Sequence, residues 1–405
     1  MSNELRDVQN LDEILRSHLK SGETIEDVRT TRLTAVGDNY GSLMLRLEIR
    51  LKNDVTKDSR TLEVVAKTLP RSEFVQHIFN VQVTFKNEIA FYTSIIPALD
   101  RFAKERDASA DTDFVPKPYG GRISLNPANA VVDDDAVLIL ENLKILGYKN
   151  GSRQEGFDLS TSKLILESFV KLHAYSIGLR LEDPKVFESD VKPYLHDYIF
   201  DEKLVEMAID KTRDILKAEG LAADLIERSI ETIKQRNKNA VEPWIGVTHN
   251  DGWVNNIMIK WDENDRPVSV KLVDFQVCEY KSVLRDILFF LFTSVRNDIL
   301  ADNLDKLLDH YYENFVATLK NIGVDASRYS RESYDEHLKI AARDYVYFHT
   351  VVMLEPILTD KPVDLSDLSF EELEKTPRFQ ETSSGHKDKL LLVTNTFDAK
   401  GWLVS

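Results

Sequence analysis

The sequence predicts an α+β protein in which a small, strand-rich N-terminal part precedes a large, mainly helical C-terminal part. Apolar and polar residues alternate over 44–51, and a second apolar run covers 62–66, as is typical of strands. After about residue 145 the apolar residues recur every three or four positions, which is typical of helices. A chain of 405 residues is long enough for at least two domains. We therefore predict one domain over residues 1–141 and a second over 142–405.

In the first part we expect two helices around the strands. Residues 3–20 place leucines along one stripe and predict an amphipathic helix. Residues 73–96 predict a long helix that ends at Pro97, because proline cannot continue the backbone hydrogen bonds. The run AVLILEN at 136–142 predicts a short, mostly apolar strand with a polar end.

In the second part the pattern is helical with one interruption. A strand hairpin is predicted over 256–274, and a loop over 360–385. We expect helices over 160–179, 203–218, 222–236, 283–297, 301–321, 332–357 and 387–400.

Charge and cysteine content exclude several classes of protein. The net charge of −16 repels phosphate backbones, which argues against nucleic acid or an anionic membrane as the main partner. Cys278 is the only cysteine, so no intramolecular disulfide or CxxC motif exists, as expected in a reducing compartment. The charged first twenty residues do not resemble a signal peptide, and the longest apolar run, 287–292, is far shorter than the ~20 residues of a membrane span. We expect a cytoplasmic protein without membrane contact.

The most informative segment is VTHNDGWVNNIMIKWDENDRPVSVKLVDFQ, residues 247–276. With a turn near residue 265, paired residue numbers in the hairpin sum to about 530, so Asn256 is predicted to lie opposite Asp274. Asp251 lies in the loop just before the hairpin. Carboxylate and amide oxygens at Asp274 and Asn256 suit magnesium, and Asp251 suits a base near an attacking hydroxyl. His249-x-Asp251 followed by Asn256 and by Asp274-Phe275 is the pattern of kinase catalytic loops. We expect His249 itself to be a buried histidine that bonds backbone atoms.

Phosphate contacts are expected from the first part. A loop between two strand-like runs has two glycines that let backbone N–H groups approach a phosphate. The loop residues that we expect to contact the nucleotide are Gly37, Asn39, Tyr40, Gly41 and Ser42. Lys67 ends an apolar strand and can reach a phosphate as a point charge, and Glu88 could pair with it. Taken singly, these are also typical of a hairpin turn, a solvated lysine and a solvated glutamate. Their order along the chain favours the functional interpretation.

That order of motifs, together with the residues within them, resembles the ecdysteroid kinase-like family of insects and related animals. The family is also called CHK kinase-like and is a distant relative of choline kinases and aminoglycoside phosphotransferases. The matching segments are GDNYGS (37–42), VVAKTLP (64–70), NEIAFYTSIIPAL (87–99), LILENLKILGY (138–148), KLHAYS (171–176), THNDGWVNNIM (248–258), VKLVDFQ (270–276), LRDILFFLFTSV (284–295) and FDAKGWL (397–403).

The resemblance implies a two-lobed protein-kinase-like fold and transfer of the ATP γ-phosphate, with Mg²⁺, to a hydroxyl of a small molecule. On the nucleotide side, Lys67 would hold the α- and β-phosphates and Glu88 would orient Lys67. The hinge beside adenine would be formed by Glu141, Asn142 and Leu143.

On the catalytic side, the resemblance implies that Asp251 is the base and that Asn256 and Asp274 hold magnesium. Asp286 would brace the catalytic loop from the following helix. Lys67, Asp251, Asn256 and Asp274 are thus the residues that the resemblance assigns to catalysis.

Two positions depart from the family pattern. Asn250 replaces the usual glycine after the catalytic-loop histidine, and asparagine is a residue that tolerates positive φ, so the backbone can be kept. Asn142 replaces the usual hinge aspartate, which costs little if adenine is bound through backbone atoms and lowers nucleotide affinity if that aspartate contacts ribose. Neither change removes a group that the chemistry needs.

The acceptor is the open question at this level. The resemblance suggests an ecdysteroid or a similar hydroxylated metabolite or xenobiotic, the latter in detoxification. Alternatives are a choline or ethanolamine kinase and an inactive nucleotide- or ligand-binding module. A protein kinase is disfavoured because no A-P-E segment follows Asp274. Aromatic residues that could wall an acceptor pocket, although core packing is their usual role, are Tyr194, Tyr198, Phe200, Tyr345, Tyr347 and Phe348. The sequence does not predict an oligomeric state.

Overall fold

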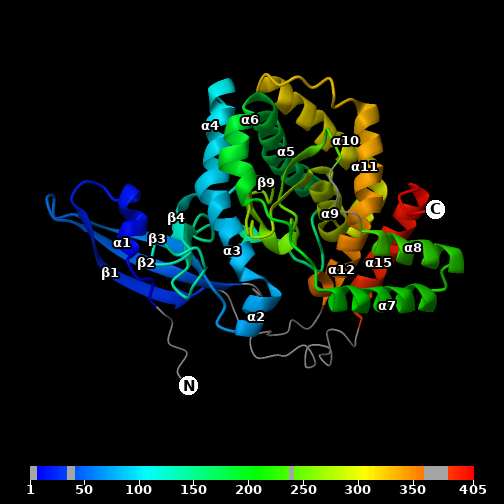
Figure 1. The fold of residues 1–405 in the computed structure, drawn as a ribbon, viewed down its shortest axis with the longest axis horizontal. Helices are drawn as coiled ribbons and strands as arrows, with labels where there is room; N and C mark the ends of the chain where they lie inside the picture. Colours follow the sequence, from blue (N-terminus) through cyan, green and yellow to red (C-terminus); the bar gives the residue numbers. More distant parts are fainter. Residues whose placement is uncertain (1–6, 34–41, 237–240, 360–381) are drawn as a thin grey trace.

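The computed structural model describes residues 7–33, 42–236, 241–359 and 382–405. A small lobe built on a five-stranded sheet lies at one end, and a larger, mainly helical lobe fills the rest (Figure 1). The predicted α+β class and two-lobed, protein-kinase-like fold are confirmed. Within the described residues, no helix combines the length and the apolar character that crossing a membrane requires.

The sheet of the N-lobe is antiparallel and has the order β1-β2-β3-β5-β4. Its strands are β1 (Glu23–Arg32), β2 (Leu43–Asn53), β3 (Ser59–Thr68), β4 (Pro118–Arg122) and β5 (Val137–Glu141). The alternation predicted for β2 is confirmed, because Leu45, Leu47, Ile49 and Leu51 are all buried on one face. The sequence analysis missed β1, whose polar residues give no apolar alternation.

The predicted helix over residues 3–20 is wrong in extent. Within the described residues it is reduced to α1 (Leu11–Leu15) and a 3₁₀ turn over Arg16–His18. Asn10 has a φ of 47°, a left-handed conformation from which an α-helix cannot continue backwards. Leu11 and Leu15 nevertheless pack in the core of the N-lobe, as their spacing predicts.

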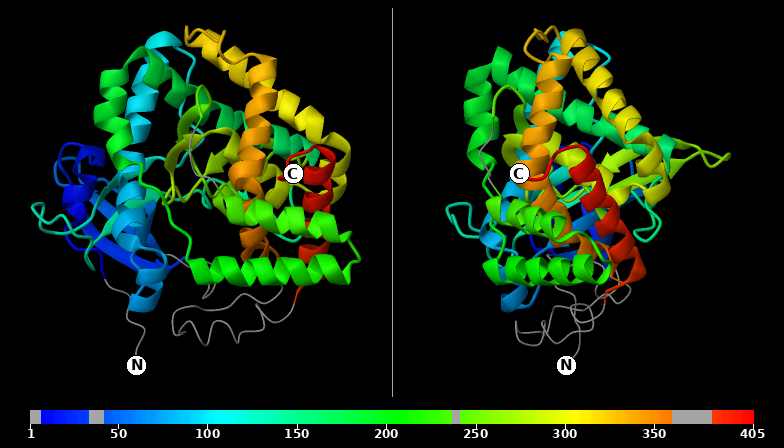
Figure 2. Two further views of the ribbon diagram at one scale, coloured as in Figure 1. Left: turned by 45° about the vertical axis from the view of Figure 1, so that its right-hand side comes forward. Right: turned by 90° about the vertical axis from the view of Figure 1, so that its right-hand side faces the viewer.

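The predicted single helix over 73–96 is a series of shorter pieces, and Pro97 does not end it. The pieces are α2 (Glu73–Ile78), α3 (Val81–Ala90), a π-helical turn over Phe91–Ile95 and α4 (Ile96–Arg106). Asn80, with a φ of 45°, separates α2 from α3. Pro97 lies in the first turn of α4, where a missing N–H is tolerated. Since α4 packs against α5 of the C-lobe, this helical series passes from one lobe to the other (Figure 2).

The helices predicted for the C-lobe are present, with small shifts at their ends. The region 332–357 is divided by a π-helical turn over Ala342–Val346, and the loop predicted over 360–385 lies mostly outside the described residues. The helices are α5 (Leu159–Glu182), α6 (Pro184–Val186), α7 (Glu202–Ala218), α8 (Ala223–Gln235), α9 (Leu284–Ser294), α10 (Asn297–Asn321), α11 (Arg331–Ala341), α12 (Tyr347–Leu358) and α15 (Ser384–Ala399).

Two small sheets of the C-lobe face the N-lobe and carry the loops of interest. One pairs β7 (Ile245–Thr248) with β10 (Glu279–Ser282), and the other has the order β6-β8-β9. Its strands are β6 (Lys149–Asn150), β8 (Ile257–Trp261) and β9 (Pro267–Leu272). The hairpin predicted over 256–274 is therefore confirmed.

The segment between α4 and β4 is tied to the C-lobe. The backbone N–H of Leu272 donates to the carbonyl of Phe114 at 2.7 Å. Lys271 Nζ donates to Asp113 at 2.7 Å and to the carbonyl of Val115 at 3.1 Å. Residues before the predicted boundary at 141 thus contact both lobes, and the boundary itself stays a prediction.

Candidate active site

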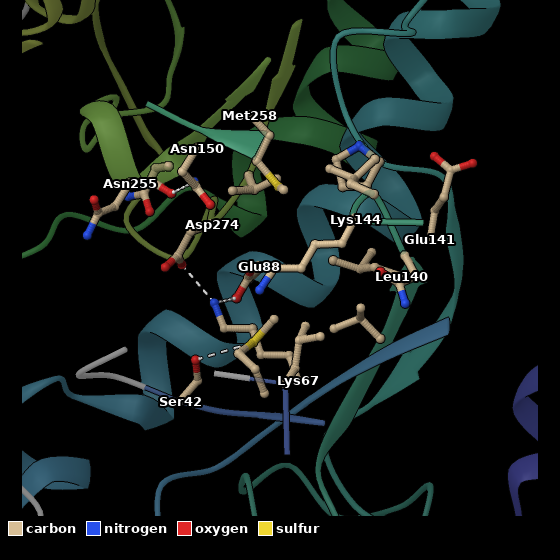
Figure 3. Close-up of a pocket in the computed structure, with 18 residues that line it drawn as sticks. Ser42, Lys67, Glu88, Leu140, Glu141, Lys144, Asn150, Asn255, Met258 and Asp274 are labelled. Carbon is tan, nitrogen blue, oxygen red and sulfur yellow. Dashed lines mark hydrogen bonds and ion pairs between the residues drawn. The ribbon is translucent and has the colours of Figure 1, made fainter. Parts of the chain in front are cut away.

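A cavity of about 150 Å³ opens between the two lobes (Figure 3). Its walls are formed by the ends of β2 and β3, by α3, by the segment after β5, and by the hairpin β8–β9. The predicted site residues that line it are Ser42, Lys67, Glu88, Glu141, Asn142, Leu143, Asn256 and Asp274. Gly37, Asn39, Tyr40 and Gly41 lie outside the described residues.

Lys67 is at the centre of this cavity. Its Nζ lies 2.6 Å from Glu88 Oε2 and 2.7 Å from Asp274 Oδ1. Lys67 is 3% exposed and Glu88 1% exposed, so neither is the solvated side chain of the alternative interpretation. The strand explains the placement: Val64 and Ala66 point into the N-lobe core, so Val65 and Lys67 point to the cavity. The predicted contact between Lys67 and Glu88 is therefore present.

The electrostatics of this trio keep the lysine charged. Burial alone would lower the pKa of Lys67, but the carboxylates of Asp274 and Glu88 raise that pKa above its usual value. Burial raises the pKa of Glu88, and the ammonium of Lys67 opposes this rise. Lys67 thus holds a fixed positive charge between carboxylates from both lobes.

The hairpin brings Asn256 and Asp274 to the cavity, but in a register that differs from the prediction. Ile257 pairs with Leu272, so paired numbers sum to 529, and the N–H of Val273 donates to the carbonyl of Asn256 at 3.0 Å. The prediction that Asn256 lies opposite Asp274 is wrong by one residue, because the turn is centred near residue 264, where the N–H of Asp262 donates to the carbonyl of Arg266, and a bulge between Lys260 and Trp261 raises the sum to only 529. A one-residue shift normally sends a side chain to the other face. Asp274 has a φ of 68°, however, and this left-handed turn leaves both side chains on the cavity.

Asp251 is fixed by Asn256. The Nδ2 of Asn256 donates to both the Oδ2 and the backbone carbonyl of Asp251, each at 2.9 Å. The other carboxylate oxygen, Oδ1, is buried and has no hydrogen-bond partner among the described residues. Burial, with a contribution from the neighbouring charge of Asp274, raises the pKa of Asp251 well above its usual value. Such a carboxylate has a high affinity for a proton, as a general base needs.

Asp286, at the start of α9, holds the loop that carries Asp251. Its carboxylate accepts from the backbone N–H of His249 at 2.6 Å and of Asn250 at 2.8 Å. His173 Nε2 lies 3.0 Å from the same carboxylate, and its Nδ1 lies 2.8 Å from the hydroxyl of Tyr311. The sequence analysis assigned no role to His173, although it lies in the quoted segment KLHAYS.

His249 and Asn250 behave as predicted. His249 is fully buried, and its Nε2 lies 3.0 Å from the carbonyl of Val273, so it links the loop to the hairpin. Burial lowers the pKa of His249, which favours the neutral ring. Asn250 has a φ of 62°, a left-handed conformation that asparagine adopts more readily than most non-glycine residues.

The hinge segment follows β5 directly. Glu141 pairs with Val64 at the end of the sheet, and Leu143 is buried at the cavity wall. Asn142 is 2% exposed, and its Oδ1 has no hydrogen-bond partner among the described residues.

The residues present fit a magnesium ion. The side chain of Asp274 is 26% exposed, so its carboxylate is accessible from the cavity. Because the Nδ2 of Asn256 is used by Asp251, its Oδ1 is the atom that remains for a cation. Two hard oxygens suit an ion that takes its other ligands from phosphates and water. Among the described residues, no cluster of three or more His, Cys, Asp or Glu side chains offers a complete protein cage.

The aromatic residues divide into two groups. Tyr345, Tyr347 and Phe348 are buried in the C-lobe core, as the core-packing interpretation expects. Tyr198 and Phe200 are partly exposed, and their ring centroids lie 5.3 Å apart. Burial, with contributions from the negative charges of Asp251 and Asp201, raises the pKa of Tyr198 to about 12. Tyr194 is exposed.

One known family matches most of the chain. The sequence model of the ecdysteroid kinase-like family matches residues 36–324. A search of curated proteins found no significant match.

Among solved structures, the chain is similar to an ethanolamine kinase of Plasmodium vivax. The identity is 12%, 92% of this chain and 83% of that chain are covered, and the TM-score is 0.43. It is also similar to a choline kinase of Cryptosporidium parvum at 9% identity, with 93% and 91% covered and a TM-score of 0.47. A wild-type aminoglycoside 2'-phosphotransferase-IIIa is similar at 10% identity, with 97% and 100% covered and a TM-score of 0.45.

Proposed function

Because the chain belongs to the ecdysteroid kinase-like family, we propose that it transfers the γ-phosphate of ATP to a hydroxyl of a small molecule. The acceptor that we propose is an ecdysteroid or a similar hydroxylated metabolite or xenobiotic. One observation carries the proposal. Lys67 of the N-lobe contacts Asp274 of the C-lobe, and the candidate base Asp251 is tied to Asn256 beside them.

We assign the site residues as follows. Lys67, oriented by Glu88, binds the α- and β-phosphates. Ser42, which lines the cavity, also contacts the nucleotide, and we assign the same role to Gly37, Asn39, Tyr40 and Gly41, which lie outside the described residues. The backbone of Glu141, Asn142 and Leu143 binds adenine. Asp274 and the Oδ1 of Asn256 hold magnesium, which when bound neutralises charge on the phosphates.

Asp251 performs the proton transfer. Its carboxylate accepts the proton of the acceptor hydroxyl while the acceptor oxygen forms its bond to the γ-phosphorus and the bond to the departing ADP breaks. Asn256 holds this carboxylate in place through its hydrogen bond to Oδ2. Asp286 fixes the backbone on which Asp251 is carried, so it positions the base without touching substrate.

The family favours an uncharged hydroxylated acceptor, with choline or ethanolamine as the second candidate. Two carboxylates near Tyr198 already have partners: Glu279 Oε1 accepts from the N–H of Tyr198 at 2.6 Å, and Asp197 pairs with Lys281 at 2.8 Å. The half-buried rings of Tyr198 and Phe200 offer aromatic faces that suit an apolar ring system and also a quaternary ammonium group, so the acceptor panel separates the two classes. A single, buried cysteine fits a cytoplasmic location.

The test is an assay of ATP consumption with magnesium and a panel of acceptors. The panel contains ecdysteroids, plant phenolics and glycosides, choline and ethanolamine, and Asp251→Asn is the control. We expect turnover with a hydroxylated, uncharged acceptor and loss of that turnover in the control. Turnover with choline or ethanolamine alone would favour the amine kinase. Binding of ATP without turnover on a widened panel would favour a binding module.

A further inference from the structure

Lys144 is a second lysine of the nucleotide cavity. It follows the hinge, at the start of the turn over 143–148, and it lines the cavity together with Lys67. Figure 3 shows its side chain extending across the cavity, away from the hinge and towards the side where Lys67 and Glu88 lie. No residue of the described ranges forms an ion pair with it, whereas Lys67 pairs with two carboxylates.

The charge balance of the cavity gives this lysine its significance. Lys67 and Lys144 are the only cationic side chains among the described residues that line it. The charge of Lys67 is shared by two carboxylates at 2.6 and 2.7 Å, so it is already compensated before any ligand binds. A triphosphate carries several negative charges, and an uncompensated ammonium attracts it more strongly than a paired one does.

We propose that Lys144 is a phosphate-binding lysine that contacts the polyphosphate of the nucleotide from the hinge side. This inference rests on the proposed function, because it assigns a further ligand contact within the same cavity. The flexible four-carbon stem of lysine allows the ammonium to follow a phosphate without a fixed geometry. Lys67 and Lys144 then contact the phosphate chain from two sides. Lys67 is held in place by its two carboxylate partners, whereas Lys144 can move with the phosphates.

The test uses nucleotide binding without any acceptor. Isothermal titration calorimetry gives the Kd values of ATP, ADP and adenosine for the full chain and for Lys144→Met, Lys144→Arg and Lys149→Met. Lys149 is an exposed lysine on β6 that does not line the cavity, so it is the matched control. We expect Lys144→Met to weaken ATP and ADP binding about tenfold, the scale of a hydrogen bond to a charged group. Adenosine binding should change less than about twofold, and Lys144→Arg should keep most of the ATP affinity.

Three outcomes separate the possibilities. Equal losses for adenosine and ATP would overturn the inference, because they would mean that Lys144 supports the hinge instead of binding phosphate. Unchanged ATP affinity in Lys144→Met would overturn it as well, while leaving the proposed function intact. Failure of the unaltered chain to bind ATP would overturn the proposed function and this inference with it. Melting temperatures of all variants verify that they are folded.

Discussion

The two halves of the site are built in different ways. Lys67 and Glu88 project from a central strand and a helix, and both are buried among regular elements. Asp251 and Asp274 lie in loops, and the backbone beside them depends on left-handed conformations at Asn250 and Asp274. The first half is positioned by sheet register and packing, whereas the second is positioned by hydrogen bonds that compensate for unfavourable backbone angles. Substitutions of Lys67 or Glu88 should therefore mainly lower the free energy of unfolding, whereas substitutions of Asp251 or Asp274 should mainly lower turnover.

Asp274 is the residue that the two halves share, so its substitution should have the largest effect. Replacing it by asparagine removes the charge of the proposed metal ligand and an ion-pair partner of Lys67. We expect turnover to fall by at least ~10³-fold, because a lost metal removes several kcal/mol of charge stabilisation. Steady-state ATP turnover at saturating magnesium measures this. Turnover within tenfold of the unaltered chain would contradict the assignment.

Substitutions in the buried half, Lys67 and Glu88, should change the free energy of unfolding. Lys67→Met leaves the Glu88 carboxylate buried without its cation, and we expect the free energy of unfolding to fall by about 3–5 kcal/mol. The double variant Lys67→Met/Glu88→Leu removes both charges, so most of that stability should return while activity stays absent. Urea unfolding of the single and double variants measures the difference. An unstable double variant would show that packing, and not the unpaired charge, causes the loss.

The loop half should lose activity while gaining stability. Asp251→Asn should lower turnover by at least ~10²-fold, the scale of a lost general base. Burial raises the pKa of Asp251 in the folded chain, so its stabilising contribution is present at acidic pH and is lost as pH rises through that pKa. At neutral pH asparagine removes a buried negative charge, and the melting temperature should rise.

Scanning calorimetry of Asp251→Asn and the unaltered chain between pH 4 and pH 8 tests this sign. The gain in melting temperature should shrink towards acidic pH, where the unaltered carboxylate is protonated. A gain that does not change with pH would contradict the cause that we assign.

Asn250 should show the smallest effect. Because its φ is 62°, Asn250→Ala should lower the free energy of unfolding by about 1 kcal/mol, the penalty of a left-handed residue with an ordinary Cβ. Asn250→Gly should stay within about 0.5 kcal/mol, since glycine adopts this conformation freely. Chemical denaturation of the pair measures the difference. Equal stability of the alanine and glycine variants would contradict the backbone explanation.

Local patterns predicted much of the fold. The alternation in β2 and the spacing in α5 follow from which side chains are buried, and that signal is local in the sequence. β1 escaped prediction because most of its residues are polar or half-exposed. Pro97 was misplaced because a preceding π-helical turn, which has no sequence signal that we can identify, allows the chain to continue as α4.

The site was predictable where short motifs carry it and less so where distant contacts do. Asp251, Asn256 and Asp274 lie within one hairpin unit, so their meeting could be expected, although the turn is centred one residue earlier than predicted. His173 and Tyr311 meet Asp286 only through tertiary packing, which spacing does not encode. Lys144 gave no signal either, because the direction of a flexible side chain depends on the cavity around it.

The chain crosses between the lobes at more places than the hinge alone. It passes towards the C-lobe through α4, returns after the segment held by Leu272 and Lys271, and crosses again after Glu141. A body attached at several separated points has no single free axis of rotation. Rotation of one lobe away from the other would therefore have to move the contacts of Leu272 and Lys271 with the segment before β4 as well as the hinge.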